Sequence, residues 1–176
     1  HGEDLWQALQ GPHADPHMWD YMGYGPFQQY ADFQQWLRSF ASRSDPLFYS
    51  VIEQCSGKVI GLLSYLNIIP AHGNIEIGHV CFGHAMQRST VATETIYLLA
   101  KQAFALGNRR LEWKCDNANL RSKRAAERFG FSYEGLFRQH QVRKGRNRDT
   151  AWYSIIDQEW PAIQRAFEGW LAVDNF

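Results

Sequence analysis

The sequence predicts one mixed α/β domain in which helices flank a central, twisted, mostly antiparallel sheet. Three β-rich runs follow one another at residues 47–54, 58–68 and 74–82, separated by turns that contain Gly57 and Pro70, a pattern typical of antiparallel strands. Helical periodicity precedes these runs, and strands and helices alternate after them. With 176 residues, 45% of them hydrophobic, the chain can bury one substantial core but not comfortably two.

Helices are expected before the first strand. The first 45 residues are rich in aromatic side chains and are interrupted by Gly-Pro and Asp-Pro pairs at 11–12, 15–16 and 25–26, which favours short helices joined by turns. Within residues 27–43, apolar side chains recur at spacings of three and four. They are Tyr30, Phe33, Leu37 and Phe40, and this face should be buried.

Strands and helices alternate after residue 86. A helix that ends at Gly107 carries an apolar stripe made by Ile96, Leu99, Ala100, Ala103 and Phe104, and glycine is the usual residue just past a helix end. Residues 109–115 form the next predicted strand. A second helix over residues 119–130 has Asn119 available as its cap and Gly130 at its end.

The last third of the chain predicts a hairpin and a helix. Residues 131–141 and 149–157 are expected to be strands around a turn with the sequence KGRNR. The final helix has Trp160, Ile163 and Phe167 at helical spacing, and Pro161 is tolerated in its first turn. The result is a strand-helix-strand unit inside a mixed sheet.

Composition excludes several function classes. Lys and Arg number 18, as do Asp and Glu, so no global basic field favours binding to nucleic acid or membranes. The three cysteines, Cys55, Cys81 and Cys115, form no C-x-x-C pair, which argues against a disulfide framework and a metal site. No apolar run approaches the roughly 20 residues of a membrane span. A cytoplasmic protein is expected, and His1 suggests that the native start is missing.

Small and polar residues between the third β-rich run and the next helix indicate an anion site. The first backbone N–H groups of a helix lie at the positive end of its dipole, and Ser89, Thr90 and Ala92 would let a diphosphate approach them. Gln87 and Arg88 could add side-chain donors. An ordinary capped helix explains the same residues.

Two motifs resemble those of the GNAT superfamily of acyl-CoA N-acyltransferases, and a third segment resembles more narrowly its RimJ/RimL-type branch. The family's Gln/Arg-x-x-Gly-x-Gly/Ala loop is similar to QRSTVA at Gln87 and Ala92, although Thr90 departs from the pattern. The segment NLRSKRAAERFGF, beginning at Asn119, resembles the family's N-x-x-S/A...GF segment. The stretch EGLFR, beginning at Glu134, resembles the branch's E-G-x-x-R segment. The resemblance places the family's first strand before His1.

The resemblance implies that acetyl-CoA is the acyl donor and that specific residues hold it. The thioester arm would pair with the strand backbone near Val80 and Phe82, and the Asn119 side chain would bind the pantetheine arm. Arg124, with Arg121 and Lys123, is placed for the 3′-phosphate. The implied binding residues are Val80, Phe82, Gln87, Arg88, Ser89, Thr90, Val91, Ala92, Thr93, Asn119, Ser122 and Arg124.

The resemblance also implies transfer of an acetyl group to a primary amine, on a protein N-terminus or a small molecule, by direct attack in a ternary complex. Glu76 is the candidate base, and a paired structural carboxylate explains it equally well. His140 is a second candidate base, although a surface histidine is the commoner explanation. Many members use a tyrosine as the acid, where this chain has Ala126; Ser122 is the candidate acid instead.

Aromatic residues near the start would form the acceptor pocket. Trp19, Tyr21, Tyr24 and Phe27 lie where the family builds it, although core packing explains most aromatic residues. Two other classes of function stay open. One is a CoA-binding sensor or partner protein without catalysis, and the other is a ribosome- or RNA-binding module that uses the basic hairpin, which the zero net charge disfavours. A homodimer is possible for the branch, and no metal is expected.

Overall fold

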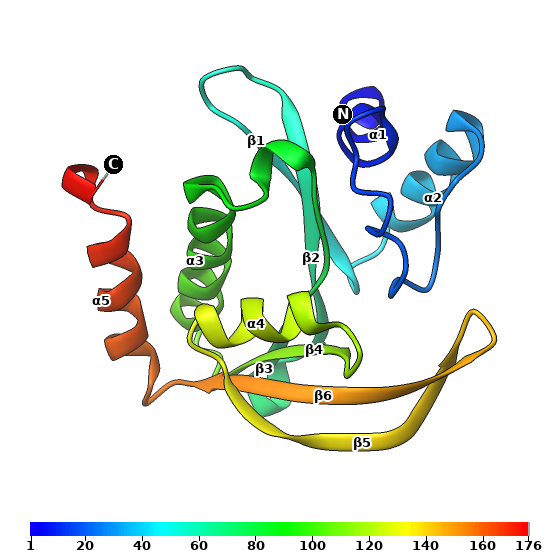
Figure 1. Cartoon of the computed structure of the whole chain (residues 1–176). Helices are drawn as coiled ribbons and strands as arrows, with labels where there is room; N and C mark the ends of the chain where they lie inside the picture. The colour runs from blue at the N-terminus through cyan, green and yellow to red at the C-terminus, as the bar shows by residue number, and fades with distance from the viewer. Residues whose placement is uncertain (176) are drawn as a thin grey trace. The chain divides into compact units, whose positions relative to one another are not determined.

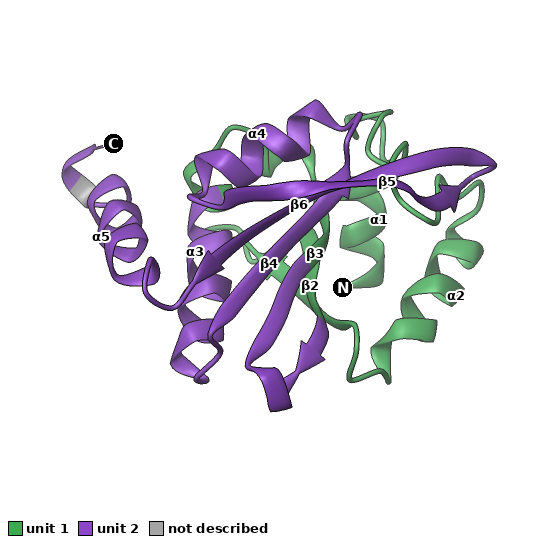
Figure 2. Cartoon of the chain, turned by 90° about the horizontal axis from the view of Figure 1, so that it is seen from below, with its two compact units in different colours: residues 1–66, 78–92 green, residues 67–77, 93–176 purple. Residues whose placement is uncertain are grey.

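The computed structural model describes residues 1–175 and confirms the mixed α/β class (Figure 1). The described strands form one sheet in the order β1-β2-β3-β4-β6-β5. The β1–β2, β4–β6 and β5–β6 pairs are antiparallel, and the β3–β4 pair is parallel. Two compact units are distinguished, residues 1–66 with 78–92 and residues 67–77 with 93–176 (Figure 2), and each is described by itself. The single-domain expectation stays a prediction.

Unit 1 contains the N-terminal helices and the first strands. Its elements are α1 (Gly2–Gln10), α2 (Tyr30–Ala41), β1 (Leu47–Ile52), most of β2 (Val59–Ile69), the end of β3 (Asn74–Phe82), the short helix η2 (His84–Met86) and the start of α3 (Thr90–Ala105). The expected α2 face is present, with Phe33 fully buried and Tyr30, Leu37 and Phe40 partly buried. The core also includes Trp36, which the spacing argument had left out.

A glycine in unit 1 marks a close approach of backbone to a buried ring. Gly25 has a φ of 63°, and a Cβ built on it would lie 2.6 Å from Cδ2 of Trp19, whose side chain is buried. Since a left-handed φ favours glycine and the ring leaves no room, only glycine fits here without strain. This explains why position 25, between the N-terminal aromatic residues, is a glycine.

Gly25→Ala should therefore lower the free energy of unfolding by about 1–3 kcal/mol, because the methyl group meets Trp19 in addition to the φ strain. Gly57→Ala is the matched control, since Gly57 has a φ of 67° but nothing within 4 Å of its built Cβ. Urea denaturation of both variants separates the two effects. Equal losses of stability would show that the contact with Trp19 carries no cost.

Unit 2 contains the remaining sheet and its covering helices. Its elements include the start of β3, most of α3, β4 (Arg110–Asp116), α4 (Leu120–Arg128), β5 (Ser132–Arg143), β6 (Arg146–Ile156) and α5 (Trp160–Trp170). On one face of β4, Trp113 is buried and its ring centroid lies 6.2 Å from that of Phe129 and 5.6 Å from that of Phe131. That face of β4 is part of the core.

The residues expected to begin and end the helices have the expected conformations. The side chain of Asn119 caps α4 by accepting from the backbone N–H of Ser122 at 3.1 Å. Gly107 and Gly130 have φ values of 83° and 87°, the left-handed conformation usual after a helix. Pro161 lies in the first turn of α5. These confirmed features depend only on neighbours a few residues away.

The hairpin turn is shorter than the sequence predicted. β5 continues to Arg143 and β6 begins at Arg146, so the turn is Lys144 and Gly145, with φ values of 48° and 74°. Two residues with positive φ match the twist of the flanking strands and allow the tightest hairpin. The expected five-residue turn is wrong for this reason, and Arg148 lies in a strand.

Helices of the described part of the chain are too short or too polar to cross a membrane. In the same part, no group of three or more His, Cys, Asp or Glu side chains is arranged to hold a metal ion.

Candidate functional site

Charged side chains line one face of β4 in unit 2. β4 pairs with β6 along its whole length, and successive strand side chains point to opposite faces of a sheet. The charged face carries Arg110, Glu112, Lys114 and Asp116. The sequence signal was present in the alternation of RLEWKCD, but the expected site had included none of these residues.

Glu76 of β3 joins this charged face. Its carboxylate is buried, and Oε2 lies 2.9 Å from Nζ of Lys114. The side-chain amide of Asn67 donates to the same oxygen at 2.6 Å. Burial raises the pKa of Glu76 above its ordinary value, and the Lys114 ammonium and the Asn67 amide oppose that rise. A buried carboxylate whose pKa is raised is suited to accept a proton near neutral pH.

The ion pairs continue away from Glu76 as a chain. Nζ of Lys114 also lies 2.9 Å from Glu112, and Nε of Arg110 lies 2.8 Å from the other Glu112 oxygen. Arg110 then donates to Glu134 of β5 at 2.7 Å. Burial favours the neutral form of Glu112, but Lys114 and Arg110 together outweigh it, so the pKa of Glu112 is lowered. We call these five residues, Glu76, Lys114, Glu112, Arg110 and Glu134, the ion chain.

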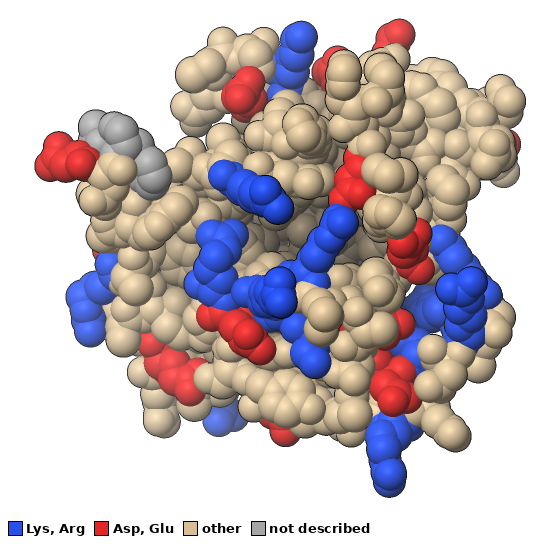
Figure 3. Space-filling model, viewed as in Figure 1, with Lys and Arg blue, Asp and Glu red and all other residues tan. Residues whose placement is uncertain are grey.

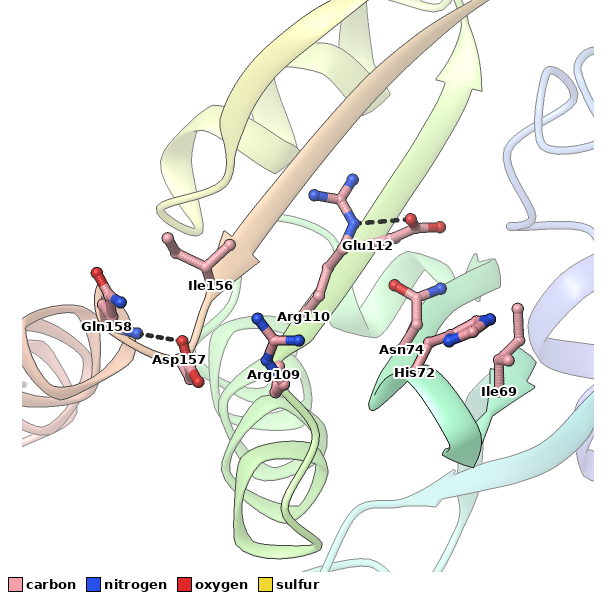
Figure 4. A pocket seen from close by; sticks show the side chains of 9 residues that line it. All are labelled: Ile69, His72, Asn74, Arg109, Arg110, Glu112, Ile156, Asp157 and Gln158. Carbon is pink, nitrogen blue, oxygen red and sulfur yellow. Dashed lines mark hydrogen bonds and ion pairs between the residues drawn. The ribbon is translucent and has the colours of Figure 1, made fainter.

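An open hollow of about 380 Å³ lies beside Arg110 and Glu112 of the ion chain. Figure 4 shows Arg110 reaching Glu112 beside it, with His72 and Asn74 side by side. The hollow is lined by Ile69, His72, Asn74, Arg109, Arg110, Glu112, Ile156, Asp157 and Gln158. None of these residues was expected in the site.

His140 lies on the β5–β6 hairpin rather than in the ion chain. Its Nδ1 is 2.9 Å from the hydroxyl of Thr150, and its ring is 6.3 Å from that of Trp152. The Trp152 ring in turn lies 3.8 Å from Nζ of Lys114. His140 is therefore connected to the ion chain through Trp152.

The helix α4 holds three of the expected residues. Because Oδ1 of Asn119 caps the helix, its amide NH₂ group is what remains to donate to a ligand. The hydroxyl of Ser122 accepts from the indole N–H of Trp113 at 3.0 Å and is also hydrogen-bonded to the Cys115 side chain, and these contacts fix its position. Arg124 is exposed. Thr93, at the start of α3 in the same unit, accepts from Arg128 at 3.0 Å.

The expected anion loop lies in unit 1, and part of its backbone is already hydrogen-bonded. The N–H of Gln87 donates to His84, that of Ser89 to Met86, and that of Ala92 to the Ser89 hydroxyl. Within residues 1–175, the amides of Arg88 and Thr90 have no such partner. The positive φ of 59° falls on Arg88, and Thr90 begins α3. A threonine at position 90 therefore fits, because that position is helical.

The strand that precedes the loop has one strained residue. His79 has a φ of 51°, immediately before Val80. Its Nδ1 is 2.6 Å from the Tyr24 hydroxyl, and its ring lies 5.1 Å from that of Phe48. Strained backbone often lies at functional sites. Val80 and Phe82 are both partly buried.

The N-terminal aromatic residues divide into core and surface. Trp19 is buried, with its ring 5.5 Å from that of Phe27 and 5.9 Å from that of Tyr24. Tyr24 and Phe27 are partly buried, whereas Tyr21 is 37% exposed. Tyr21 is therefore the member of this set most exposed to solvent.

Comparisons with known proteins agree in finding similarity to acetyltransferases. Residues 3–132 match the family model described as an acetyltransferase (GNAT) domain. An uncharacterized N-acetyltransferase, p20, of Bacillus licheniformis is 27% identical over 151 residues, which cover 84% of each chain.

Two solved structures are also similar. A GCN5-related N-acetyltransferase from Brucella melitensis has a TM-score of 0.96 and 46% identity, covering 100% of this chain and 80% of that one. A probable acetyltransferase from Chromobacterium violaceum has a TM-score of 0.85 and 44% identity, covering 92% of this chain and 80% of the other.

Proposed function

Because the chain belongs to the acetyltransferase (GNAT) domain family, we propose that it transfers an acetyl group from acetyl-CoA to a primary amine, by direct attack in a ternary complex. The observation that carries the proposal is the position of Glu76. The parallel pairing of β3 with β4 ends at Glu76 and Glu112, so this buried carboxylate lies where β3 and β4 part. The motif residues favour the RimJ/RimL-type branch, with a protein N-terminus or a small amine as acceptor.

The hydrogen-bond donors of the expected binding residues fit acetyl-CoA. Two loop amides, at Arg88 and Thr90, have no partner among the described residues, as a diphosphate requires. The remaining NH₂ of Asn119 suits a pantetheine carbonyl, and the exposed guanidinium of Arg124 suits a phosphate. When bound, acetyl-CoA supplies the activated acyl group; these residues would hold and orient it.

The reaction needs a proton acceptor because most amines are charged at neutral pH. A lysine amine with a pKa of ~10.4 is only about one part in a thousand neutral at pH 7. Glu76 would accept the amine proton, directly or through water, and the Lys114 contact keeps its carboxylate oriented. Ser122, held by Trp113, would return a proton to the departing thiolate. His140 is the alternative base.

The test is an acceptor screen with acetyl-CoA. Amino acids, peptides with free N-termini, polyamines and amine antibiotics are incubated with the protein, and free thiol is measured. At least one class should release thiol at a rate that depends on the protein. If CoA raises the melting temperature but no amine releases thiol, the CoA-binding sensor is the better reading. Ribosome pelleting that is sensitive to salt and independent of CoA would instead favour the RNA-binding module.

Asn119→Asp should weaken CoA binding by about tenfold, because it removes the NH₂ donor to the pantetheine arm, and a hydrogen bond contributes about 1 kcal/mol. Aspartate caps helices as well as asparagine does, so the melting temperature should stay the same. Calorimetric titration with CoA measures the first effect and thermal denaturation the second. Unchanged CoA affinity would mean that Asn119 serves only as the helix cap.

A further inference from the structure

Arg148 lies on β6 in unit 2, on the same face as Thr150 and Trp152. Arg148, Thr150 and Trp152 alternate along the strand, and the contact between Trp152 and Lys114 identifies this face as that of the ion chain. Arg148 is partly buried, and its Nε atom is buried and has no hydrogen-bond partner in the part of the chain that the structure describes. This is unusual, because buried polar groups are nearly always hydrogen-bonded.

Two other cations of this face, both on β4, are paired, and Arg148 is not. Arg110 and Lys114 each contact two carboxylates. Within residues 1–175, Arg148 makes no ion pair, although Asp116 and Glu76 are near enough to interact with its charge. Burial lowers the pKa of Arg148, as expected for a cation that has lost water without gaining a partner. Among residues 1–175, the buried Nε atom of this guanidinium has no hydrogen-bond partner.

The backbone of β5 is irregular next to Arg148. The pairing of β5 with β6 is irregular between Phe137 and Gln141, and Gln139 in that segment has a φ of 50°. Asp149 fixes the irregularity by accepting from the N–H of Gln139 at 2.7 Å. Such bulges often occur beside binding sites, where they re-aim a side chain. Here the irregular segment carries His140, which contacts Thr150.

We propose that Arg148 binds an anionic group of the acceptor, so that the favoured acceptor is an amine that also carries a carboxylate or a phosphate. A planar guanidinium binds either group with two parallel hydrogen bonds. The ring of Phe137 lies 4.8 Å from that of Trp152 and 5.5 Å from that of His140, and these three rings provide the adjoining apolar surface. This inference rests on the proposed function, and it adds the chemical class of the acceptor.

The test uses matched acceptors with the whole chain. One pair is γ-aminobutyrate and γ-aminobutyramide, a second is aminoethyl phosphate and ethanolamine, and a third is a peptide amide ending in Ala-Asp or Ala-Asn. The acidic member of at least one pair should have the higher kcat/KM, by about 10- to 100-fold, the range of hydrogen bonds to charged groups. The first and third pairs report a carboxylate, and the second reports a phosphate.

Arg148→Gln should remove that preference, mainly by raising KM for the acidic member. Arg146→Gln is the matched control, because Arg146 is an exposed arginine on the same strand, and it should keep the preference. The melting temperature of Arg148→Gln should not fall, because the guanidinium it removes has no ion pair to lose. A purely structural role for Arg148 would lower it.

Three outcomes would overturn the proposal. They are a wild-type protein that prefers the neutral member of every pair, an Arg148→Gln variant that keeps the preference, and an Arg146→Gln variant that loses it equally. If no amine at all is acetylated, the proposed function fails, and calorimetry of the acidic probes with the CoA-saturated protein still tests Arg148. Binding that Arg148→Gln abolishes supports the site, and absence of binding to every acidic probe refutes it.

Discussion

Replacing Glu76 by glutamine should lower kcat for amine acetylation by about 10²- to 10⁴-fold at neutral pH, the usual contribution of a positioned general base. Glutamine has the same shape but cannot accept the amine proton. The wild-type kcat should fall as the pH drops through the pKa of Glu76, because the protonated acid is no longer a base. The variant should not show this fall of kcat at low pH. Steady-state kinetics across pH, with an acceptor from the screen, measures both effects.

A matched variant separates this chemistry from the loss of a charge. Glu134→Gln removes a carboxylate from the far end of the ion chain, where the side chain is 39% exposed, and kcat should stay close to the wild-type value. An active Glu76→Gln variant with an unchanged pH profile would remove Glu76 as the base and leave it as a paired structural carboxylate. The same experiment with His140→Gln would then test the alternative.

Replacing Lys114 by methionine should lower the free energy of unfolding at neutral pH by about 3–5 kcal/mol, the cost of breaking a buried ion pair by removing one partner. Lys114 is shared by two carboxylates, Glu76 and Glu112, that are only 5% and 6% exposed. Methionine keeps an unbranched apolar side chain but not the ammonium that pairs with the carboxylates and lies over the Trp152 ring, so the loss reports the ammonium. Urea denaturation measures the change.

The pH dependence of this loss has a definite sign. The pKa of Glu112 is lowered in the folded chain, so its ionisation stabilises the fold above its ordinary pKa of 4.5, and this contribution is lost as the pH falls through the folded value. The pKa of Glu76 is raised, so its ionisation opposes folding as the pH rises through the folded value. Without Lys114, the charged forms of Glu76 and Glu112 are less stable in the folded chain. The deficit of the variant should therefore be largest near neutral pH and smaller in acid.

A lysine outside the ion chain provides the control. Within residues 1–175 the Lys123 ammonium forms no ion pair and donates to the neutral side chain of Asn117, so Lys123→Met should cost no more than about 1 kcal/mol. Equal losses for the two lysine variants, or a Lys114→Met deficit that does not change with pH, would mean that the ion chain contributes little to folding.

The sequence alone determined the order of the elements and most of their ends. The stripe of α2, the Asn119 cap, the glycines after α3 and α4 and the Pro161 start of α5 were all expected and found. Each depends on residues within a turn or two of one another, so periodicity and capping preferences reveal it. The acetyltransferase family, too, was evident from two short motifs, and the family model confirms it.

Only the tertiary structure decided which charges meet. Glu76, Lys114 and Glu134 are far apart in the sequence, and they are connected only by the register of β3, β4, β6 and β5. The same holds for Arg148, whose place on a strand depends on a two-residue turn that the sequence had made longer. Strand register is fixed by long-range pairing and packing rather than by local preference. Glu76 was a candidate from the sequence, but its charged partners Lys114 and Glu112 became visible only in the folded sheet.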